Sequence, residues 1–455
     1  GVMTDVEFYE LRYSGKPAAF LRGFRALYLG VLFNVINVAT ATLAAIKIAG
    51  VMLGVSPYAT IIATGAVTLV YCMLGGLTGV LLTDFLLFIV AMGGAVAAAV
   101  FLVNLDAVGG LTGLLAHDVV RTKLSMLPDF HNTDLAVAVF IIPVAVQWWS
   151  VWYPGSEPGG GGYVAQRMLA AKNERHATGA TLLFNVAHYA LRPWPWILVA
   201  LCSLVVFPDL PSLQAAFPHV DSGVMRHDLA YPAMMTLLPG GLRGLILASL
   251  MAAHMSTLST LLNLGSSYVV NDFYRRFARP DASERELVFV GRLAMLLTMV
   301  LGSALGLCLN NAVQAFHVIL QIGAGTGLLF ILRWFWWRIN ALSELAAMIV
   351  SFAVAVYFEF FCHADVADWK RLVVGVAVTT ASWTLVTLVT RPTDEATLRR
   401  FCRLIKPGGP GWRTVVQQAR AAGDDVESSE EKWSVPIGII AMVLGCASVY
   451  SALFA

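Results

Sequence analysis

The 455 residues of this chain are 58% hydrophobic and only 13% charged, with a formal net charge of +2. Soluble domains are about a quarter charged, so the composition excludes an ordinary soluble fold, and so small a positive excess gives no reason to expect nucleic-acid binding. The mean hydropathy of +0.73 and many apolar runs of bilayer-spanning length predict an all-helical integral membrane protein. The six cysteines are scattered without paired spacing, and they predict neither disulfides nor a metal cluster.

Eleven membrane spans are predicted along the chain. They lie at about 27–53, 58–75, 81–105, 134–153, 177–207, 241–270, 286–309, 313–333, 343–362, 371–390 and 434–454. We expect a single membrane domain over residues 1–455. It would consist of a cytoplasmic lead-in (1–26), a helix bundle (27–390), a polar cytoplasmic linker (391–433) and a last, peripheral helix (434–455).

The lysines and arginines predict the topology. When the loops are numbered alternately, 20 basic residues lie on one side of the membrane and 5 on the other. Because cytoplasmic loops carry the excess of Lys and Arg, the first side is expected to be cytoplasmic. The N-terminal end is then cytoplasmic and the C-terminal tail external.

The early spans hold four unusual polar residues. Asn34 and Asn37 share a face of span 27–53, where they could contact a substrate or form interhelical hydrogen bonds. Lys47, near the external end of that span, is expected to extend its amine to the membrane surface. Asp84 lies one turn into span 81–105. A carboxylate at that depth is costly without a function or a partner, although a helix N-terminus would also favour it.

Span 134–153 runs into a stretch with two prolines and five glycines at residues 154–162, which cannot continue a helix. Broken helices of this kind mark substrate and ion sites in membrane carriers, but an ordinary surface loop is an equal alternative.

The next span carries Asn185, His188 and Arg192 as one polar stripe. Since an arginine inside a span needs an anionic partner, either Glu157 or a bound carboxylate should face it.

A hydroxyl-rich patch interrupts the apolar span 241–270. Ala253, Ser256 and Thr257 stand at i, i+3 and i+4, so that one carbonyl and two hydroxyls converge on one helix face. Three neutral oxygens suit a small hard cation, whereas close helix packing is the alternative. His254 beside them is expected to be structural. Gln321, with His317 in the span after next, could line the same cavity or contact a neighbouring helix.

Several motifs carry a resemblance to a known family. They begin with Thr4-Asp5-Val6-Glu7-Phe8 and Arg12-Tyr13, and they end with Arg391-Pro392-Thr393-Asp394 and Pro407-Gly408-Gly409. Between these lie Gly75-Gly76-Leu77-Thr78-Gly79 with Thr83-Asp84, the stretch from Gln166 to Lys172, and Ala252-Ala253 through Asn271-Asp272-Phe273-Tyr274. With these motifs in order along nearly the whole chain, it resembles the sodium/solute symporter family, which includes bacterial sodium/proline and sodium/sugar carriers.

The resemblance implies a leucine-transporter-type fold of two inverted five-helix repeats. In that fold Thr4–Tyr13 follows the second helix of the first repeat, so the sequence is expected to be N-terminally incomplete, without the first helices of that repeat. The resemblance assigns a Na⁺ site to the Ala253 carbonyl and the Ser256 and Thr257 hydroxyls, with Asp84 on the inward exit path. The residues expected to bind substrate are Asn34, Asn37, Glu157, Asn185, His188, Arg192 and Gln321.

The expected activity is sodium-coupled symport of a small organic solute by alternating access across a bacterial inner membrane. Arg192 favours a carboxylate-bearing solute. The sequence contains no enzymatic or nucleotide-binding motif, so uphill transport would draw on an ion gradient. The resemblance implies Na⁺ as the co-transported ion, and the expected partners are the solute and the lipid bilayer, without an obligate protein partner. The alternative is a symporter-like membrane sensor that binds a solute without transporting it. The sequence does not identify the solute.

Overall fold

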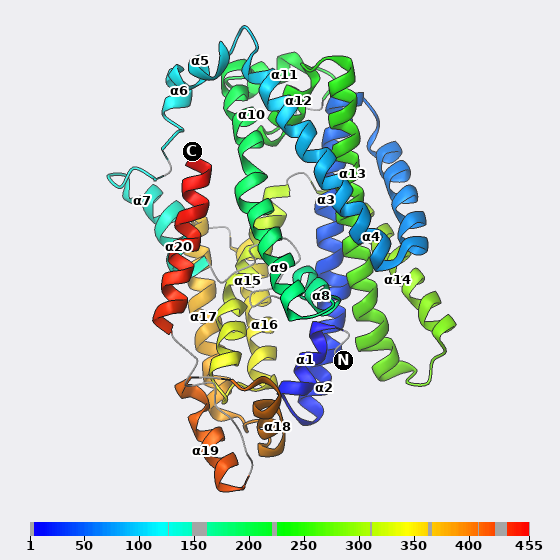
Figure 1. Ribbon diagram of the computed structural model, residues 1–455, viewed down its shortest axis with the longest axis vertical. Coiled ribbons are helices and arrows are strands. Elements are labelled where there is room, and N and C mark those ends of the chain that lie inside the picture. The colour runs from blue at the N-terminus through cyan, green and yellow to red at the C-terminus, as the bar shows by residue number, and fades with distance from the viewer. Residues whose placement is uncertain are drawn as a thin grey trace.

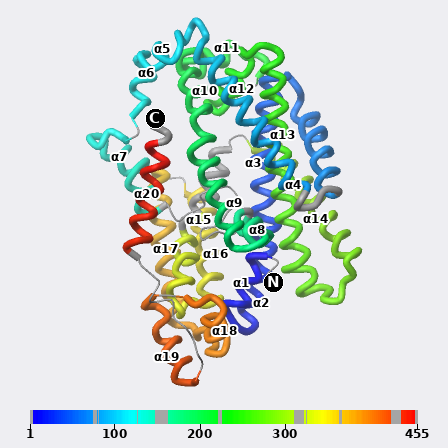
Figure 2. The backbone as a smooth tube through the Cα atoms, viewed as in Figure 1, coloured from blue at the N-terminus to red at the C-terminus, as the bar shows by residue number. Residues whose placement is uncertain are grey.

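The computed structural model describes residues 4–125, 127–147, 162–220, 225–309, 312–362, 366–407, 409–423 and 435–454, and over these ranges the chain is helical without strands. Long apolar helices stand side by side (Figure 1). Figure 2 shows α18 and α19 at the same end of the bundle as α1 and α2, with α5, α6, α11 and α12 at the opposite end. The lead-in segment and the described part of 391–433, which are predicted to be on the same side of the membrane, thus lie at one end of the bundle.

The first half of the chain contains two long helical stretches, α2 to α3 and α4, followed by shorter helices. The elements are η1 (Asp5–Glu7), α1 (Phe8–Arg12), α2 (Gly15–Leu27), η2 (Tyr28–Phe33), α3 (Asn34–Leu53), α4 (Pro57–Val103), α5 (Gly110–Ala116), α6 (Asp118–Arg121), α7 (Thr133–Ala136), η3 (Val137–Ile141) and η4 (Pro143–Gln147). They continue with α8 (Tyr163–Leu169), α9 (Glu174–Asn185), η5 (Val186–Leu191), α10 (Pro193–Val206), α11 (Leu210–Ala216), η6 (His227–Leu229) and α12 (Ala230–Thr236).

The second half supplies the remaining helices. They are α13 (Gly240–Ser267), η7 (Tyr268–Ala278), α14 (Glu284–Cys308), α15 (Ala312–Phe335), α16 (Ala341–Val356), η8 (Tyr357–Phe361), α17 (Asp368–Val389), α18 (Glu395–Ile405), η9 (Pro410–Trp412), α19 (Arg413–Ala421) and α20 (Val435–Phe454). The described residues of each of the eleven predicted spans fall on an apolar helix. Within the described ranges, seven of these helices are long enough to cross a membrane.

The two predicted spans at 58–75 and 81–105 match two apolar stretches, Pro57–Met73 and Leu81–Val103, although both belong to one helical element, α4 (Pro57–Val103). Glycine lowers helix propensity but keeps its amide, so glycines alone do not end a helix as proline does. The two arms pack separately: Gly65 faces Met299 of α14, whereas Gly94 faces Ile246 of α13. The number of apolar segments is therefore unchanged.

The segment 391–433, expected to be a linker, contains a small packed module in its described part. Leu398, Phe401 and Cys402 of α18 recur at helical spacing and are buried with Trp412. Trp412 Nε1 donates a hydrogen bond of 2.8 Å to the Trp334 carbonyl at the end of α15. The charged residues around this apolar stripe concealed its period, which is that of an amphipathic helix.

Lys47 corrects another prediction. Its side chain is only 5% exposed, and its amine lies 2.7 Å from Asp228 Oδ2 in η6. The amine is therefore neutralised by the segment between α10 and α13 instead of extending to the membrane surface, because a buried ammonium needs a charged partner.

The C-terminal half of α13 packs tightly against the continuous helix formed by η2 and α3. A Cβ atom added at Gly265 would lie 2.0 Å from Asn34 Nδ2 and 2.8 Å from the Gly30 carbonyl oxygen. Gly265→Ala should therefore force the two helices apart and destabilise the protein by about 1–3 kcal/mol, measured as a lower unfolding temperature of the purified protein. Gly93→Ala is the matched control, since nothing lies within 4 Å of its added Cβ. Equal unfolding temperatures of the two variants would contradict this prediction.

Candidate ion and solute site

The predicted ion residues lie where α13 meets α4. The Ser256 hydroxyl donates a short hydrogen bond to Oδ1 of Asp84. The next residue, Thr257, donates from its Oγ1 to the carbonyl of Ala253, one turn earlier in α13, at 2.9 Å. Ala253 and Thr257 lie on an exposed face of α13, whereas Ser256 is half-buried. The structure thus places a carboxylate beside the hydroxyl-rich patch and keeps the carbonyl and second hydroxyl adjacent.

Asp84 lies well inside α4 and not in its first turn. The favourable effect of a helix N-terminus, which acts only on the first turn, therefore does not explain this carboxylate. Its side chain is 24% exposed, and its Oδ2 lies 3.5 Å from Arg167 Nη2. The explanation favoured by the structure is pairing with polar neighbours.

Arg167 is a member of this cluster that the sequence analysis did not identify. It lies on α8, and besides facing Asp84 it donates to Thr260 Oγ1 of α13 at 3.3 Å. In the sequence, Arg167 belongs to the motif from Gln166 to Lys172 and to the basic residues of the predicted cytoplasmic side, and neither pattern predicts a role at the ion site. The sequence signal that could have identified it is its position in the short helix α8, directly after the glycine-rich stretch. As a result, α4, α8 and α13 meet at one polar cluster.

Of the predicted substrate residues, Asn34 and Asn37 are both buried on α3. Asn34 Nδ2 donates to the Leu261 carbonyl at 3.0 Å, which joins α3 to α13. The structure therefore gives Asn34 the interhelical role that was the alternative, and contact of either residue with substrate stays a prediction.

Of the three residues in the predicted polar stripe, the structure brings two into contact. Asn185 bonds back to the Thr181 carbonyl of its own helix at 2.8 Å. His188 Nδ1 lies 3.2 Å from Arg192 Nη1, and the Arg192 guanidinium lies over the Trp196 ring, 4.6 Å from its centroid. His188 and Arg192 thus form one polar group. Glu157 and the side chain of Gln321 lie outside the described residues.

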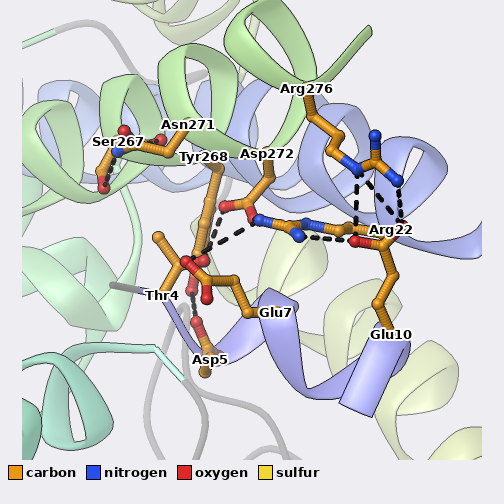
Figure 3. A network of polar contacts seen from close by, with 10 residues as sticks. All are labelled: Thr4, Asp5, Glu7, Glu10, Arg22, Ser267, Tyr268, Asn271, Asp272 and Arg276. Atoms are coloured by element: carbon orange, nitrogen blue, oxygen red, sulfur yellow. Dashed lines mark hydrogen bonds and ion pairs between the residues drawn. The ribbon is translucent and has the colours of Figure 1, made fainter. Parts of the chain in front are cut away.

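A second polar network surrounds η7, the helix that continues α13 at its C-terminal end (Figure 3). Asp272, which is fully buried in η7, accepts from Thr4 Oγ1 at 2.7 Å and pairs with Arg22 of α2, also at 2.7 Å. Asp5 accepts from the Tyr268 hydroxyl at 2.7 Å and from the amide of Gly162 at 3.1 Å. The lead-in segment is therefore bonded both to the helix that carries the ion residues and to Gly162, the last residue of the glycine-rich stretch.

Glu10 completes this network on its exposed side. Arg22 lies 2.6 Å from one Glu10 oxygen and Arg276 lies 2.9 Å from the other. Partial burial raises the pKa of Glu10, but hydrogen bonds from Arg276 and Arg22 outweigh it, so that the pKa is lower than usual. The carboxylate is therefore held in its charged form between two arginines.

Comparisons with known proteins support the family resemblance that the sequence motifs indicate. The model of the sodium:solute symporter family matches residues 1–351. The chain is 30% identical over 344 residues to the sodium/myo-inositol cotransporter 2 of Oryctolagus cuniculus, covering 67% of this chain and 49% of the relative. It is 25% identical over 378 residues to the sodium/glucose cotransporter of Vibrio parahaemolyticus, covering 79% of this chain and 67% of the relative. The chain thus spans about half the length of the first of these relatives.

Among solved structures, a Na⁺-coupled sialic acid symporter in its substrate-bound outward-open state matches with a TM-score of 0.63 at 21% identity. The match covers 86% of this chain and 78% of that protein. At this identity the likeness concerns the fold alone, and it confirms the predicted leucine-transporter-type helix bundle.

Proposed function

Because this chain belongs to the sodium:solute symporter family, we propose that the protein couples Na⁺ entry to the uptake of a small polar organic solute by alternating access. It would act as a carrier and not as an enzyme, in a bacterial inner membrane with its C-terminus external. The observation that supports this most is the oxygen cluster on α13, where the Ser256 hydroxyl meets Asp84 and the Thr257 hydroxyl meets the Ala253 carbonyl.

In this proposal Na⁺ binds to the Ala253 carbonyl and to the Ser256 and Thr257 hydroxyls. Hydroxyl and carbonyl oxygens replace part of the hydration shell of a hard cation. Asp84 receives the ion on its way to the cytoplasm, where Arg167 already lies 3.5 Å from one carboxylate oxygen. The guanidinium then competes with Na⁺ for the carboxylate, which prevents the exit position from holding the ion too tightly.

The solute is proposed to bear a carboxylate. Arg192 is half-buried beside His188, and a guanidinium can hold a carboxylate with two hydrogen bonds. The relatives are named for myo-inositol and glucose, whereas the matching solved structure is named for sialic acid. A sugar acid therefore combines the chemistry of both groups of relatives with the charge of Arg192.

The proposed function is tested with the full-length protein in proteoliposomes. An inward Na⁺ gradient should drive accumulation of at least one labelled solute from a panel of glucose, myo-inositol, sialic acid and proline, and an equal K⁺ gradient should not. Saturable solute binding without Na⁺-driven accumulation would overturn the carrier and favour the sensor.

Arg192→Gln tests the proposed solute class. If Arg192 holds a carboxylate, its removal should lower affinity for the acidic solute by roughly thirtyfold or more, measured as competition of Na⁺-driven uptake. Arg175→Gln, on the exposed cytoplasmic end of α9, is the matched control. Neutral sugars that compete fully in the wild type, with acids that do not compete, would show that the solute carries no carboxylate.

A further inference from the structure

A groove runs along α17, away from the cluster on α13. It has a volume of about 700 Å³ and is lined by Val373, Ala377, Ala381 and Leu388 of α17, with Val146 of η4 and Leu328 of α15. From Val373 to Leu388 the helix rises roughly 22 Å. Because α17 is a membrane-spanning helix by length and hydropathy, the groove lies at a depth where lipid acyl chains are the solvent.

Two arginines lie at the cytoplasmic end of this groove. Arg338 Nη2 donates to the carbonyl of Leu388, a groove residue, at 3.1 Å and to that of Thr390 at 3.2 Å. Arg391 follows directly, and its carbonyl accepts from Asn340 Nδ2 at 3.3 Å. Within the part of the chain that the structure describes, neither arginine forms an ion pair.

The two arginines and the apolar groove are arranged so that one ligand could contact both. The Arg338 guanidinium uses one nitrogen to cap the C-terminal carbonyls of α17, and its other donors stay available for an anion. Both arginines lie on the side predicted to be cytoplasmic, at the level where the headgroups of anionic lipids are found. The apolar groove begins at Leu388, whose carbonyl is one of the two that Arg338 caps, so a phosphate at the arginines and a chain in the groove could belong to one molecule.

We propose that this groove binds one anionic glycerophospholipid of the cytoplasmic leaflet, with an acyl chain along α17 and its phosphate at Arg338 and Arg391. A transmembrane helix from a second copy would also suit the small side chains of α17. It would leave the two cations without an anion, and for this reason the observations favour a lipid.

The test uses the full-length protein, purified in mild detergent after exposure to equal amounts of phosphatidylglycerol and phosphatidylcholine. Native mass spectrometry should find one retained lipid, with phosphatidylglycerol preferred roughly tenfold. The double variant Arg338→Gln/Arg391→Gln should lose this preference. The control Arg400→Gln/Arg420→Gln removes the same charge from exposed positions of α18 and α19 and should keep it.

Ala381→Trp separates lipid binding from the capping role of Arg338. This variant keeps both arginines but fills the groove, so it should retain no lipid while its unfolding temperature in detergent stays near that of the wild type. Equal retention of the two lipids by the wild type would overturn the proposal. Retention of phosphatidylglycerol by Ala381→Trp would also overturn it, as would a dimer that Ala381→Trp dissociates, which would assign the groove to a second copy.

Discussion

Replacing Ser256 and Thr257 together by Ala is expected to weaken Na⁺-driven uptake so strongly that little remains at Na⁺ concentrations that saturate the wild type, without reducing the amount of folded protein. The double variant removes two hydroxyl oxygens, of which one faces Asp84 and the other the Ala253 carbonyl. A hydrogen bond or ligand contact to a charged group contributes about 1.5–3 kcal/mol. Losing two should lower the apparent Na⁺ affinity roughly a hundredfold, measured as the Na⁺ concentration that gives half-maximal uptake.

Ser249→Ala is the matched control for this experiment. Ser249 lies on α13 and bonds back to the Ile246 carbonyl at 2.8 Å, so its replacement removes a hydroxyl from the same helix without touching the cluster. The control should keep the wild-type dependence on Na⁺. If the double variant keeps it as well, the ion binds elsewhere and the assignment of α13 is wrong.

The second large effect is expected from Arg22→Gln. This change leaves Asp272 as a buried carboxylate without its arginine, and it removes one of the two arginines that hold Glu10. Breaking a buried pair by removing one partner costs about 3–5 kcal/mol, since the remaining charge is uncompensated. The variant should therefore unfold at a distinctly lower temperature, measured on purified protein in detergent.

A double variant distinguishes the buried charge from general damage to the site. Adding Asp272→Asn removes that charge, so Arg22→Gln/Asp272→Asn should recover part of the lost stability. Arg279→Gln is the control: its pair with Glu286 is exposed, and an exposed pair contributes less than about 1 kcal/mol. A double variant less stable than Arg22→Gln would indicate that Asp272 acts through other contacts.

The two ends of this network explain why its loss should also slow transport. Asp5 accepts from the Gly162 amide and from Tyr268, and Tyr268 continues the helix that carries Ser256 and Thr257. The lead-in segment therefore connects the start of α8 to the end of the α13–η7 rod. In a carrier that works by rocking one group of helices against another, such contacts must break and re-form in each cycle.

The sequence alone determined the features that depend on local pattern. Apolar run length located the spans, the Lys and Arg distribution indicated the cytoplasmic side, and the 3.6-residue period placed Ala253, Ser256 and Thr257 on one face. Each of these properties follows from neighbours within a few turns of a helix, so the printed residues suffice. The sequence also predicted the two apolar stretches within residues 58–103, although the helical hydrogen bonding of α4 continues between them.

Only the tertiary structure decided which polar groups meet. Ser256 and Asp84 are 172 positions apart, and Arg22 and Asp272 are 250 apart. Lys47 pairs with Asp228 of η6, and Asn34 donates to a backbone carbonyl of α13. Arg167, on the short helix α8, lies beside Asp84 of α4. A buried polar group must pair with whatever the crossing helices bring near it, and the crossing points depend on side-chain packing between segments that are distant in sequence. For this reason hydropathy and periodicity predicted the helices, whereas the partners of their charged and amide side chains came only from the folded bundle.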